Sequence, residues 1–185
     1  LGKGAYGEVN AALMVGGRNV RRALKRVRYE KFEPSERARV EHQHCQEAML
    51  MLKLGMHPNI VALHYCVVSE GEFLMFLTLV AGAIGLDAAA TGRSAVLYAG
   101  TITEAQRRIE IVLFDVAGAL GFCHSRGVLH QDLKQENIIL GDGRAKLMDF
   151  GLSTKGTGVD GDLRAPFKGF TPGFDSPEVV ALTTA

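Results

Sequence analysis

The segment from residue 128 to residue 151 constrains the chain most strongly, because it places polar anchors around two short apolar runs. It reads VLHQDLKQENIILGDGRAKLMDFG, and its anchors are Asp132, Lys134, Asn137 and Asp149. The runs 138–140 and 145–148 flank Gly-Asp-Gly, a pattern that predicts a tight hairpin. The hairpin returns Asp149 to the neighbourhood of Asn137, where a carboxylate beside an amide oxygen suits Mg2+.

A second carboxylate, Asp132, lies within reach of the same place, where it can orient an attacking hydroxyl. This set of groups resembles the catalytic loop and metal-binding motif of eukaryotic-type protein kinases. The matching residues are His130-Gln131-Asp132-Leu133-Lys134, Asn137 and Asp149-Phe150-Gly151. The alternative is a surface loop with scattered polar residues, which the correct order of so many anchors disfavours.

Composition limits the classes of protein that remain. The 185 residues are 47% hydrophobic and 22% charged, which predicts a globular chain with its own core. The formal net charge of +1 provides no field that would recruit nucleic acid or a membrane surface, so we expect neither as a partner. The most apolar run, 73–86, is too short to span a bilayer. Three widely spaced cysteines fit no disulfide framework, which favours an intracellular, cytoplasmic protein.

Glycines at positions 2, 4 and 7 open the chain and allow backbone N–H groups to approach phosphates closely. A dinucleotide-binding turn has the same spacing, but it needs a helix next. The runs 9–15 and 20–28 instead read as two strands around Gly16-Gly17. The resemblance therefore implies a phosphate loop, with nucleotide contacts from Gly2, Lys3, Gly4, Gly7 and Val9.

The second of these strands carries Ala23-Leu24-Lys25. Lys25 resembles the family's strand lysine that holds the α- and β-phosphates of ATP, with Ala23 in the ceiling over the adenine. The alternative for a single lysine is a solvated face. Its position after the glycine-rich loop distinguishes Lys25 from the neighbouring arginines.

A helix is expected from Ser35, as the N-cap, towards Leu54, before Gly55. It resembles the mobile helix C of the family, which carries a glutamate that pairs with the strand lysine. Glu47 is the first candidate for this role and Glu41 the second. The polar residues His42, His44 and Cys45 suggest a metal site, but residues two apart on a helix diverge, so we expect them to face solvent.

Two further strands are expected at 61–68 and 72–80, with Ser69-Glu70-Gly71 as the turn between them. By resemblance, Leu77 occupies the gatekeeper position at the back of the adenine pocket. The backbone from Thr78 to Val80 then forms the hinge that bonds the adenine, and Ile139 of the predicted hairpin belongs to the same pocket.

The segment Thr103-Glu104-Ala105-Gln106 has the form of a capping box, and the apolar periodicity of 109–123 predicts a helix that ends near Gly127. This helix should pack beneath the catalytic loop. His130 is therefore expected to be a buried packing residue rather than a base. The resemblance places it in a hydrophobic spine with Met51, Leu63 and Phe150.

Residues 152–168 are polar and glycine-rich and form a candidate activation loop. The segment 170–178 resembles the one that closes this loop, with Ser176-Pro177-Glu178 in place of the usual Ala-Pro-Glu. The chain stops soon afterwards, at Ala185, so the resemblance implies a C-terminal lobe that is incomplete after this segment.

The implied fold is α+β, the two-lobed protein-kinase-like fold. Residues 1–80 would form the N-lobe, an antiparallel sheet with helix C, and residues 81–185 a truncated, mainly helical C-lobe. The implied function is ATP-dependent phosphoryl transfer to serine or threonine hydroxyls of protein substrates, since Lys134 after Asp132-Leu133, together with Thr171, resembles the serine/threonine branch.

The resemblance gives each of these residues a role. Asp132, Lys134, Lys25 and Glu47 would be catalytic, and Asn137 and Asp149 would bind Mg2+. A pseudokinase, as an inactive or weakly active nucleotide-binding scaffold, and a partial gene product are the alternatives.

Gln131 departs from the pattern, because most members of the family carry arginine beside the catalytic aspartate. That arginine pairs with a phosphorylated activation-loop residue, which neutral glutamine cannot do. We therefore expect kcat/KM of the full-length protein to be largely independent of activation-loop phosphorylation. Alanine at Ser153, Thr154 and Thr157 together, compared with phosphatase-treated and untreated parent, tests this. A loss of about a hundredfold in the alanine variant and the treated parent alike would contradict it, and would point to another basic residue such as Arg126 or Arg164.

Overall fold

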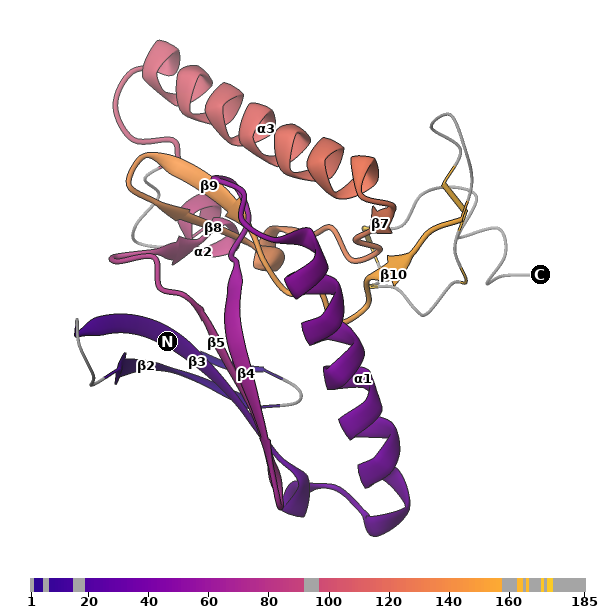
Figure 1. The fold of residues 1–185 in the computed structure, drawn as a ribbon. Coiled ribbons are helices and arrows are strands. Elements are labelled where there is room, and N and C mark those ends of the chain that lie inside the picture. Colours follow the sequence, from indigo (N-terminus) through magenta and orange to yellow (C-terminus); the bar gives the residue numbers. More distant parts are fainter. Residues whose placement is uncertain are drawn as a thin grey trace.

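Antiparallel strands form the sheet that carries the first part of the chain. Among the described residues they number five, in the order β1-β2-β3-β5-β4 (Figure 1). Their bounds are Gly2–Gly4, Gly7–Met14, Val20–Arg28, Leu63–Ser69 and Glu72–Thr78. The register places Lys25 of β3 between Val9 of β2 and Met75 of β5. One face of the sheet is core, since Val27, Phe73 and Met75 are completely buried.

The computed structural model describes residues 2–4, 7–14, 19–91, 97–157, 163, 164, 166, 171, 173 and 174. Within these ranges the expectation of an α+β fold with an antiparallel sheet and packed helices is confirmed. The activation-loop closing motif Ser176-Pro177-Glu178 lies outside them.

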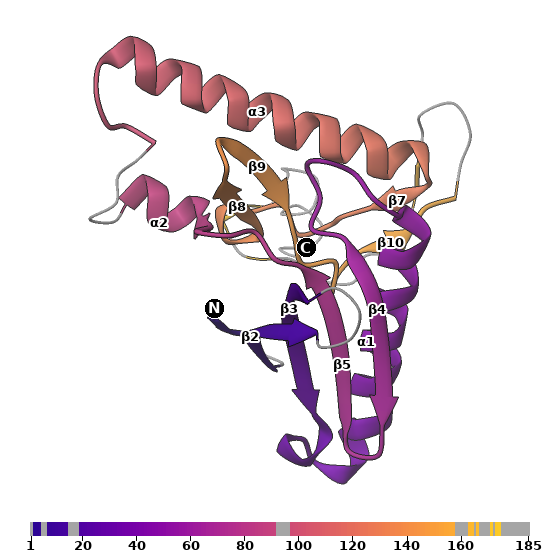
Figure 2. The ribbon, with the colours of Figure 1, turned by 60° about the vertical axis from the view of Figure 1, so that its left-hand side comes forward.

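Helix α1 runs from Pro34 to Leu54 and packs beside β4 and β5 (Figure 2). The expected N-cap Ser35 is wrong, because Glu33 precedes the helix and Pro34 takes its first turn. Proline is well suited there, since its missing N–H would have no helical partner and its φ is already helical. Gly55, at φ 72°, ends the helix as expected and donates its N–H to the Met51 carbonyl.

The buried face of α1 is more polar than its sequence suggested. The buried residues of α1 recur three and four positions apart, as one helical face requires. They are Val40, His44, Glu47, Ala48, Met51 and Leu54. The prediction that the His42, His44 and Cys45 group faces solvent is therefore wrong for His44, which is buried, and for Cys45, which is half-buried. The His44 Nδ1–H donates to the Val40 carbonyl at 2.7 Å, so a local bond satisfies one ring nitrogen of the buried imidazole.

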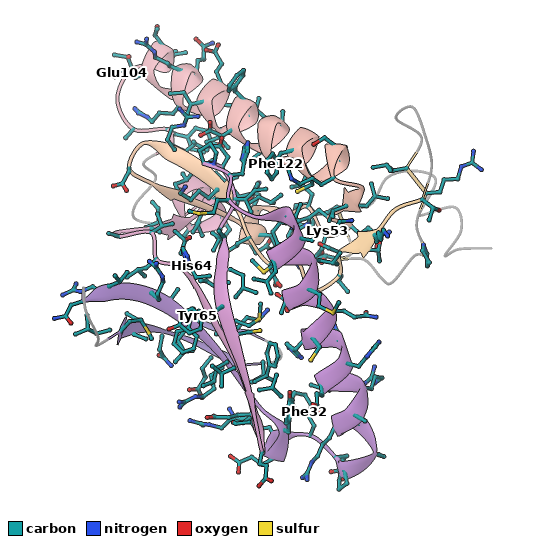
Figure 3. All side chains as sticks on the ribbon, viewed as in Figure 1. Phe32, Lys53, His64, Tyr65, Glu104 and Phe122 are labelled. Carbon is teal, nitrogen blue, oxygen red and sulfur yellow. The ribbon has the colours of Figure 1, made fainter. Side chains whose placement is uncertain are left out.

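Helix α3, Ile102–Ser125, begins with a capping box two residues before the predicted one. The Thr101 hydroxyl accepts the Glu104 N–H, and the Glu104 carboxylate accepts the Thr101 N–H at 2.8 Å. The prediction that Thr103 opens the box is wrong because Thr101 and Glu104 have the required spacing of three. Figure 3 shows Glu104 at this end of the helix and Phe122 near the other.

Short elements connect these helices to the loops. The structure assigns β6 to Ile84–Gly85, α2 to Leu86–Thr91, β7 to Val128–Leu129, η2 to Gln135–Asn137 and β10 to Thr154–Lys155. The remaining short element is η1, Tyr29–Lys31, between β3 and α1. The predicted hairpin is present as β8, Ile138–Gly141, and β9, Arg144–Leu147, and β6 pairs with β8 on its other edge.

Strand β9 is hydrogen-bonded both to α3 and to the segment that precedes β4. On one side, the buried Asp115 of α3 accepts the Ala145 N–H at 2.8 Å and the Arg144 guanidinium. On the other, Asn59, just before β4, donates its amide to the Ala145 carbonyl at 3.0 Å, and the Leu147 carbonyl accepts the Val61 N–H. These bonds fix the hairpin relative to the sheet, and hence fix the chain that follows it into Asp149.

Within the described ranges, none of the helices combines the length and apolar character needed to cross a bilayer.

We expect residues 1–185 expressed alone to self-associate, because α3 exposes Ile102, Leu113 and Phe114 by 65% or more. Large apolar side chains gathered on one element favour association. Leu113→Lys with Phe114→Lys should shift the chain towards monomer in light scattering. Gln106→Lys with Glu110→Gln adds the same charge at exposed polar positions of α3 and should not.

A sharp, reversible thermal transition with monomeric elution of the unmodified chain would contradict this expectation.

Candidate active site

A cavity of about 750 Å³ is lined by residues from the sheet, from α1 and from the loops around β8 and β9. Twelve of the sequence-predicted residues line it: Val9, Ala23, Lys25, Glu47, Leu77, Thr78, Val80, Asp132, Lys134, Asn137, Ile139 and Asp149. Segments from the whole length of the chain, from β2 to the loop after β9, therefore converge on one space. A volume of this size is typical of a site for a small molecule.

The glycine-rich residues Gly2, Lys3, Gly4 and Gly7 lie in β1 and β2, which pair antiparallel with Gly2 opposite Val9. Because Val9 lines the cavity, the β1–β2 ladder reaches the cavity at this point. The surroundings of the Lys3 side chain are not among the described features.

Lys25 and Glu47 form the buried ion pair of the site. The Lys25 Nζ donates to Glu47 Oε1 at 2.7 Å and to Glu47 Oε2 at 3.0 Å. The Glu47 side chain is only 3% exposed, so its charge is compensated by this contact rather than by water. Glu41, the other candidate, is exposed on the same helix. The structure thus brings Glu47, and not Glu41, to Lys25.

Asp149 also lies beside Lys25, with Oδ1 3.5 Å from the Nζ. Burial alone would lower the pKa of Lys25, but the charges of Glu47 and Asp149 raise it above its usual value. Lys25 therefore carries its charge at neutral pH. The Asp149 side chain is 50% exposed, which leaves part of its carboxylate open to the cavity.

Asp132 is held by three donors. Its Oδ1 accepts the Thr171 hydroxyl at 2.6 Å, and its Oδ2 accepts the Asn137 amide at 2.9 Å and lies 2.9 Å from the Lys134 Nζ. Lys134 also donates to the Thr171 oxygen at 2.7 Å. The four side chains thus form one closed network at the cavity wall.

This network sets the charge of Asp132. Its partial burial would raise the pKa of the carboxyl, but the hydrogen bonds from Thr171, Lys134 and Asn137 outweigh burial and hold the pKa below its usual value. Asp132 is therefore an ionised acceptor in the structure. The hydroxyl of Thr171 shows that this carboxylate can accept a hydrogen bond from an aliphatic alcohol.

Asn137 and Asp149 are arranged as oxygen donors. The Asn137 amide nitrogen is fully used, because it donates to the Asp132 carbonyl and carboxylate, so its amide oxygen is the group left for another ligand. Asp149 adopts a left-handed backbone, φ 61°, a conformation that aspartate tolerates better than most residues. Because both residues line the cavity, which also contains Glu136, the donor set is hard, oxygen-rich and negatively charged.

No group of three or more His, Cys, Asp and Glu side chains with metal-site geometry occurs in the described part of the chain.

His130 is a packing residue in this structure. It is 3% exposed, and its ring meets Phe150 edge-on at a centroid distance of 4.9 Å. The Asp132 N–H donates to Nδ1, and the Nε2–H donates to the Met148 carbonyl. Burial lowers the pKa of His130, so the ring is neutral. Met51, Leu63 and Phe150 belong to the same buried core.

Several lining residues were not assigned to the site from the sequence. Thr171 is the most important, since it contacts Asp132 across 39 positions of the chain, whereas the sequence used it only as a sign of the serine/threonine branch. Met148 and Val61 line the cavity too. A usable signal existed for Met148, because it directly precedes Asp149-Phe150-Gly151.

The start of the candidate activation loop is ordered and buried. Ser153 is 1% exposed and donates to the His130 carbonyl at 3.0 Å, and Thr154 is 5% exposed. Neither hydroxyl is open to solvent, so phosphorylation of either one would require this segment to leave its place.

The sequence is similar to known proteins along its whole length. The family model for the protein kinase domain matches residues 1–185. CBL-interacting protein kinase 4 of Oryza sativa subsp. japonica is 33% identical over 97% of this chain and 37% of its own length.

Two other relatives are similar over the same share of this chain. CBL-interacting serine/threonine-protein kinase 26 of Arabidopsis thaliana is 30% identical over 97% of the chain and 38% of its own length. Ribosomal protein S6 kinase alpha-3 of Mus musculus is also 30% identical over 97% of the chain, and 23% of its own length is covered. The chain thus spans less than two fifths of each of these three relatives. With a family model that matches it from end to end, the chain belongs to the protein kinase family.

Proposed function

We propose that this chain transfers the γ-phosphoryl group of ATP to serine or threonine hydroxyls of a protein substrate. The observation that carries the proposal is the network in which ionised Asp132 accepts an alcohol hydrogen bond while Lys134 donates to the same alcohol oxygen. A substrate hydroxyl in the place of Thr171 would meet the same two groups. The Arabidopsis thaliana relative that is named a serine/threonine-protein kinase supports this substrate class.

Asp132 would orient the attacking oxygen and accept its proton at Oδ1. Lys134, 2.9 Å from Oδ2, would place positive charge beside the incoming oxygen and the transferred phosphoryl group. Lys25 would hold the α- and β-phosphates, with Glu47 fixing the ammonium from behind. The protein's part is therefore positioning and charge compensation rather than covalent chemistry.

Mg2+ would be held by the Asn137 amide oxygen and the Asp149 carboxylate. When bound, it would neutralise charge on the phosphates. The residues fit this role because the described lining holds the carboxylates of Glu47, Asp132, Glu136 and Asp149 but only the ammonium groups of Lys25 and Lys134. The excess negative charge favours a cation beside the phosphates of ATP.

The adenine would lie between apolar side chains from both parts of the molecule. Val9 and Ala23 line the cavity from the sheet, Ile139 lines it from β8, and Leu77 lies at the end of β5. The backbone from Thr78 to Val80 would bond the adenine edge. In this proposal the N-lobe, residues 1–80, and the C-lobe, residues 81–185, would meet at the adenine site.

A pseudokinase differs from this proposal in lacking phosphoryl transfer while keeping the fold. The charged residues that the transfer needs are all placed around one cavity, which favours an active enzyme over a nucleotide-binding scaffold. Mg-ATP binding alone would not separate the two, so the tests below measure transfer.

We expect Lys25→Met and Asp149→Asn each to lower kcat/KM of the full-length protein by at least about a hundredfold, because each removes charge compensation at the phosphates. Lys25→Met also leaves Glu47 buried without its partner, which costs about 3–5 kcal/mol of folding free energy. Asp149→Asn changes a half-exposed group and tests the same role without that cost. Phosphorylation of a peptide substrate is the measurement.

Transfer at near parental rate in both variants, with thermal melting showing that they are folded, would rule out the proposed active site.

The choice between the two glutamates has its own test. Glu47→Gln keeps the shape of the side chain but removes the charge that holds Lys25, so we expect kcat/KM to fall by about tenfold or more. Glu41→Gln makes the same chemical change on the exposed face of α1 and should leave kcat/KM within about twofold of the parent. Equal losses in the two variants would contradict the assignment of Glu47.

A further inference from the structure

The side chain of Gln131 joins two segments that lie far from it in the sequence. Its Oε1 accepts the hydroxyl of Thr154 at 3.1 Å, and its Nε2 donates to the Pro166 carbonyl at 3.3 Å. One amide thus contacts both the beginning and the end of the stretch 154–166. Because the next residue is Asp132, the contact point adjoins the proposed acceptor of the substrate proton.

The beginning of this stretch is fixed to the catalytic loop by backbone bonds as well. Strand β10 pairs antiparallel with β7, with Thr154 opposite Leu129, and the Gly156 N–H donates to the Gly127 carbonyl at 2.9 Å. Thr154 is buried, so its hydroxyl needs a partner inside the protein, and Gln131 is the acceptor for that hydroxyl.

The end of the stretch returns beside its beginning. Thr157 and Arg164 exchange two backbone hydrogen bonds, at 2.7 and 2.8 Å. Pro166 follows two residues later and meets the Gln131 amide, and Thr171 then reaches Asp132. The neighbours Gln131 and Asp132 therefore hold successive points of the same returning chain.

Gln131 occupies an uncommon backbone conformation for a residue with its side chain. Its φ is 63°, in the left-handed region, which costs of order 1 kcal/mol for a residue other than glycine. Such a conformation persists where surrounding contacts determine it. Here those contacts are the bonds to Thr154 and Pro166, and neither involves a formal charge.

We propose that Gln131 is a positioning residue, whose uncharged amide holds the chain after Gly151 beside the catalytic loop so that a protein substrate meets Asp132. We call the hydrogen bonds of Gln131 to Thr154 and Pro166 the Gln131 clasp. It needs only an amide, a hydroxyl and a carbonyl, and requires neither a phosphate nor an ion pair. A phosphate on Thr154 would remove the hydroxyl proton that Gln131 accepts, and so would open the clasp. The kinetic part of this inference rests on the proposed kinase function, whereas the structural part does not.

The test uses Gln131→Leu, Thr154→Val and their combination in the full-length protein, with Gln106→Leu as the matched control on the exposed surface of α3. Hydrogen exchange of the amides from 153 to 157 reports the clasp directly. We expect Gln131→Leu to speed this exchange by about fivefold or more, and Gln106→Leu to leave it unchanged. Thr154→Val should add little in the presence of Gln131→Leu, because the two residues share one bond.

The kinetic constants and the effect of salt on amide protection distinguish a positioning role of Gln131 from a purely structural one. Gln131→Leu should raise KM for a peptide substrate at least about fivefold while the Kd for Mg-ATP stays at the parental value. Protection of residues 153 to 157 in the parent should be the same at low salt and at about 0.5 M salt, and the same after phosphatase treatment. A contact that depended on an ion pair would weaken at high salt, and one that depended on a phosphate would weaken after phosphatase treatment.

Unchanged exchange in Gln131→Leu, or full additivity with Thr154→Val, would overturn the inference. Loss of protection on phosphatase treatment would overturn it too, since a phosphate would then hold the segment. If the parent binds Mg-ATP but transfers no phosphate, the proposed function fails while the exchange experiment still decides whether Gln131 is the clasp.

The same geometry changes how alanine at Ser153, Thr154 and Thr157 should be understood. Alanine at position 154 removes the hydroxyl that Gln131 holds, so a loss of activity in that variant has a cause unrelated to phosphorylation. The phosphatase-treated parent is therefore the arm that isolates the phosphate.

Discussion

The ion pair between Lys25 and Glu47 is the interaction on which the rest of the site depends. A carboxylate that is 3% exposed is stable only if its partner is close, so β3 and α1 must pack in one relative position. The same ammonium lies 3.5 Å from Asp149, which ties the loop after β9 to that position. One lysine thus links the sheet, the helix and the proposed metal-binding loop, and a shift of α1 would disturb all three.

Asp132 differs from Glu47, because several hydrogen bonds, one of them from the nearby Lys134 ammonium, keep it ionised rather than a single partner. Thr171, Lys134 and Asn137 each donate to it, and the last two also serve other proposed functions. The two halves of the site are therefore held by different means. The sheet side is held by an ion pair between elements, and the loop side by a short network whose members are mostly close in sequence.

That difference explains how far the sequence could predict the structure. Strand β3 and the hairpin β8–β9 follow from local pattern and agree with the structure. The structure also brings Asp132, Asn137 and Asp149 to one cavity, while their roles stay a prediction. The contact of Thr171 with Asp132 could not be read, because it depends on how a long loop returns. The polar identity of His44 concealed its burial, since only the tertiary position of α1 decides which helical face is inward.

Ala145 has an unusual place between the two parts of the molecule. Its N–H is held by Asp115 of α3 and its carbonyl by Asn59, next to the sheet. A residue held from both sides ties β9 to α3 and to the segment before β4 at once. If the sheet and α3 rotate against each other, we expect the smallest displacement near Ala145 and the largest at the outer rim of the sheet, so that the cleft would open by an angular motion about β9.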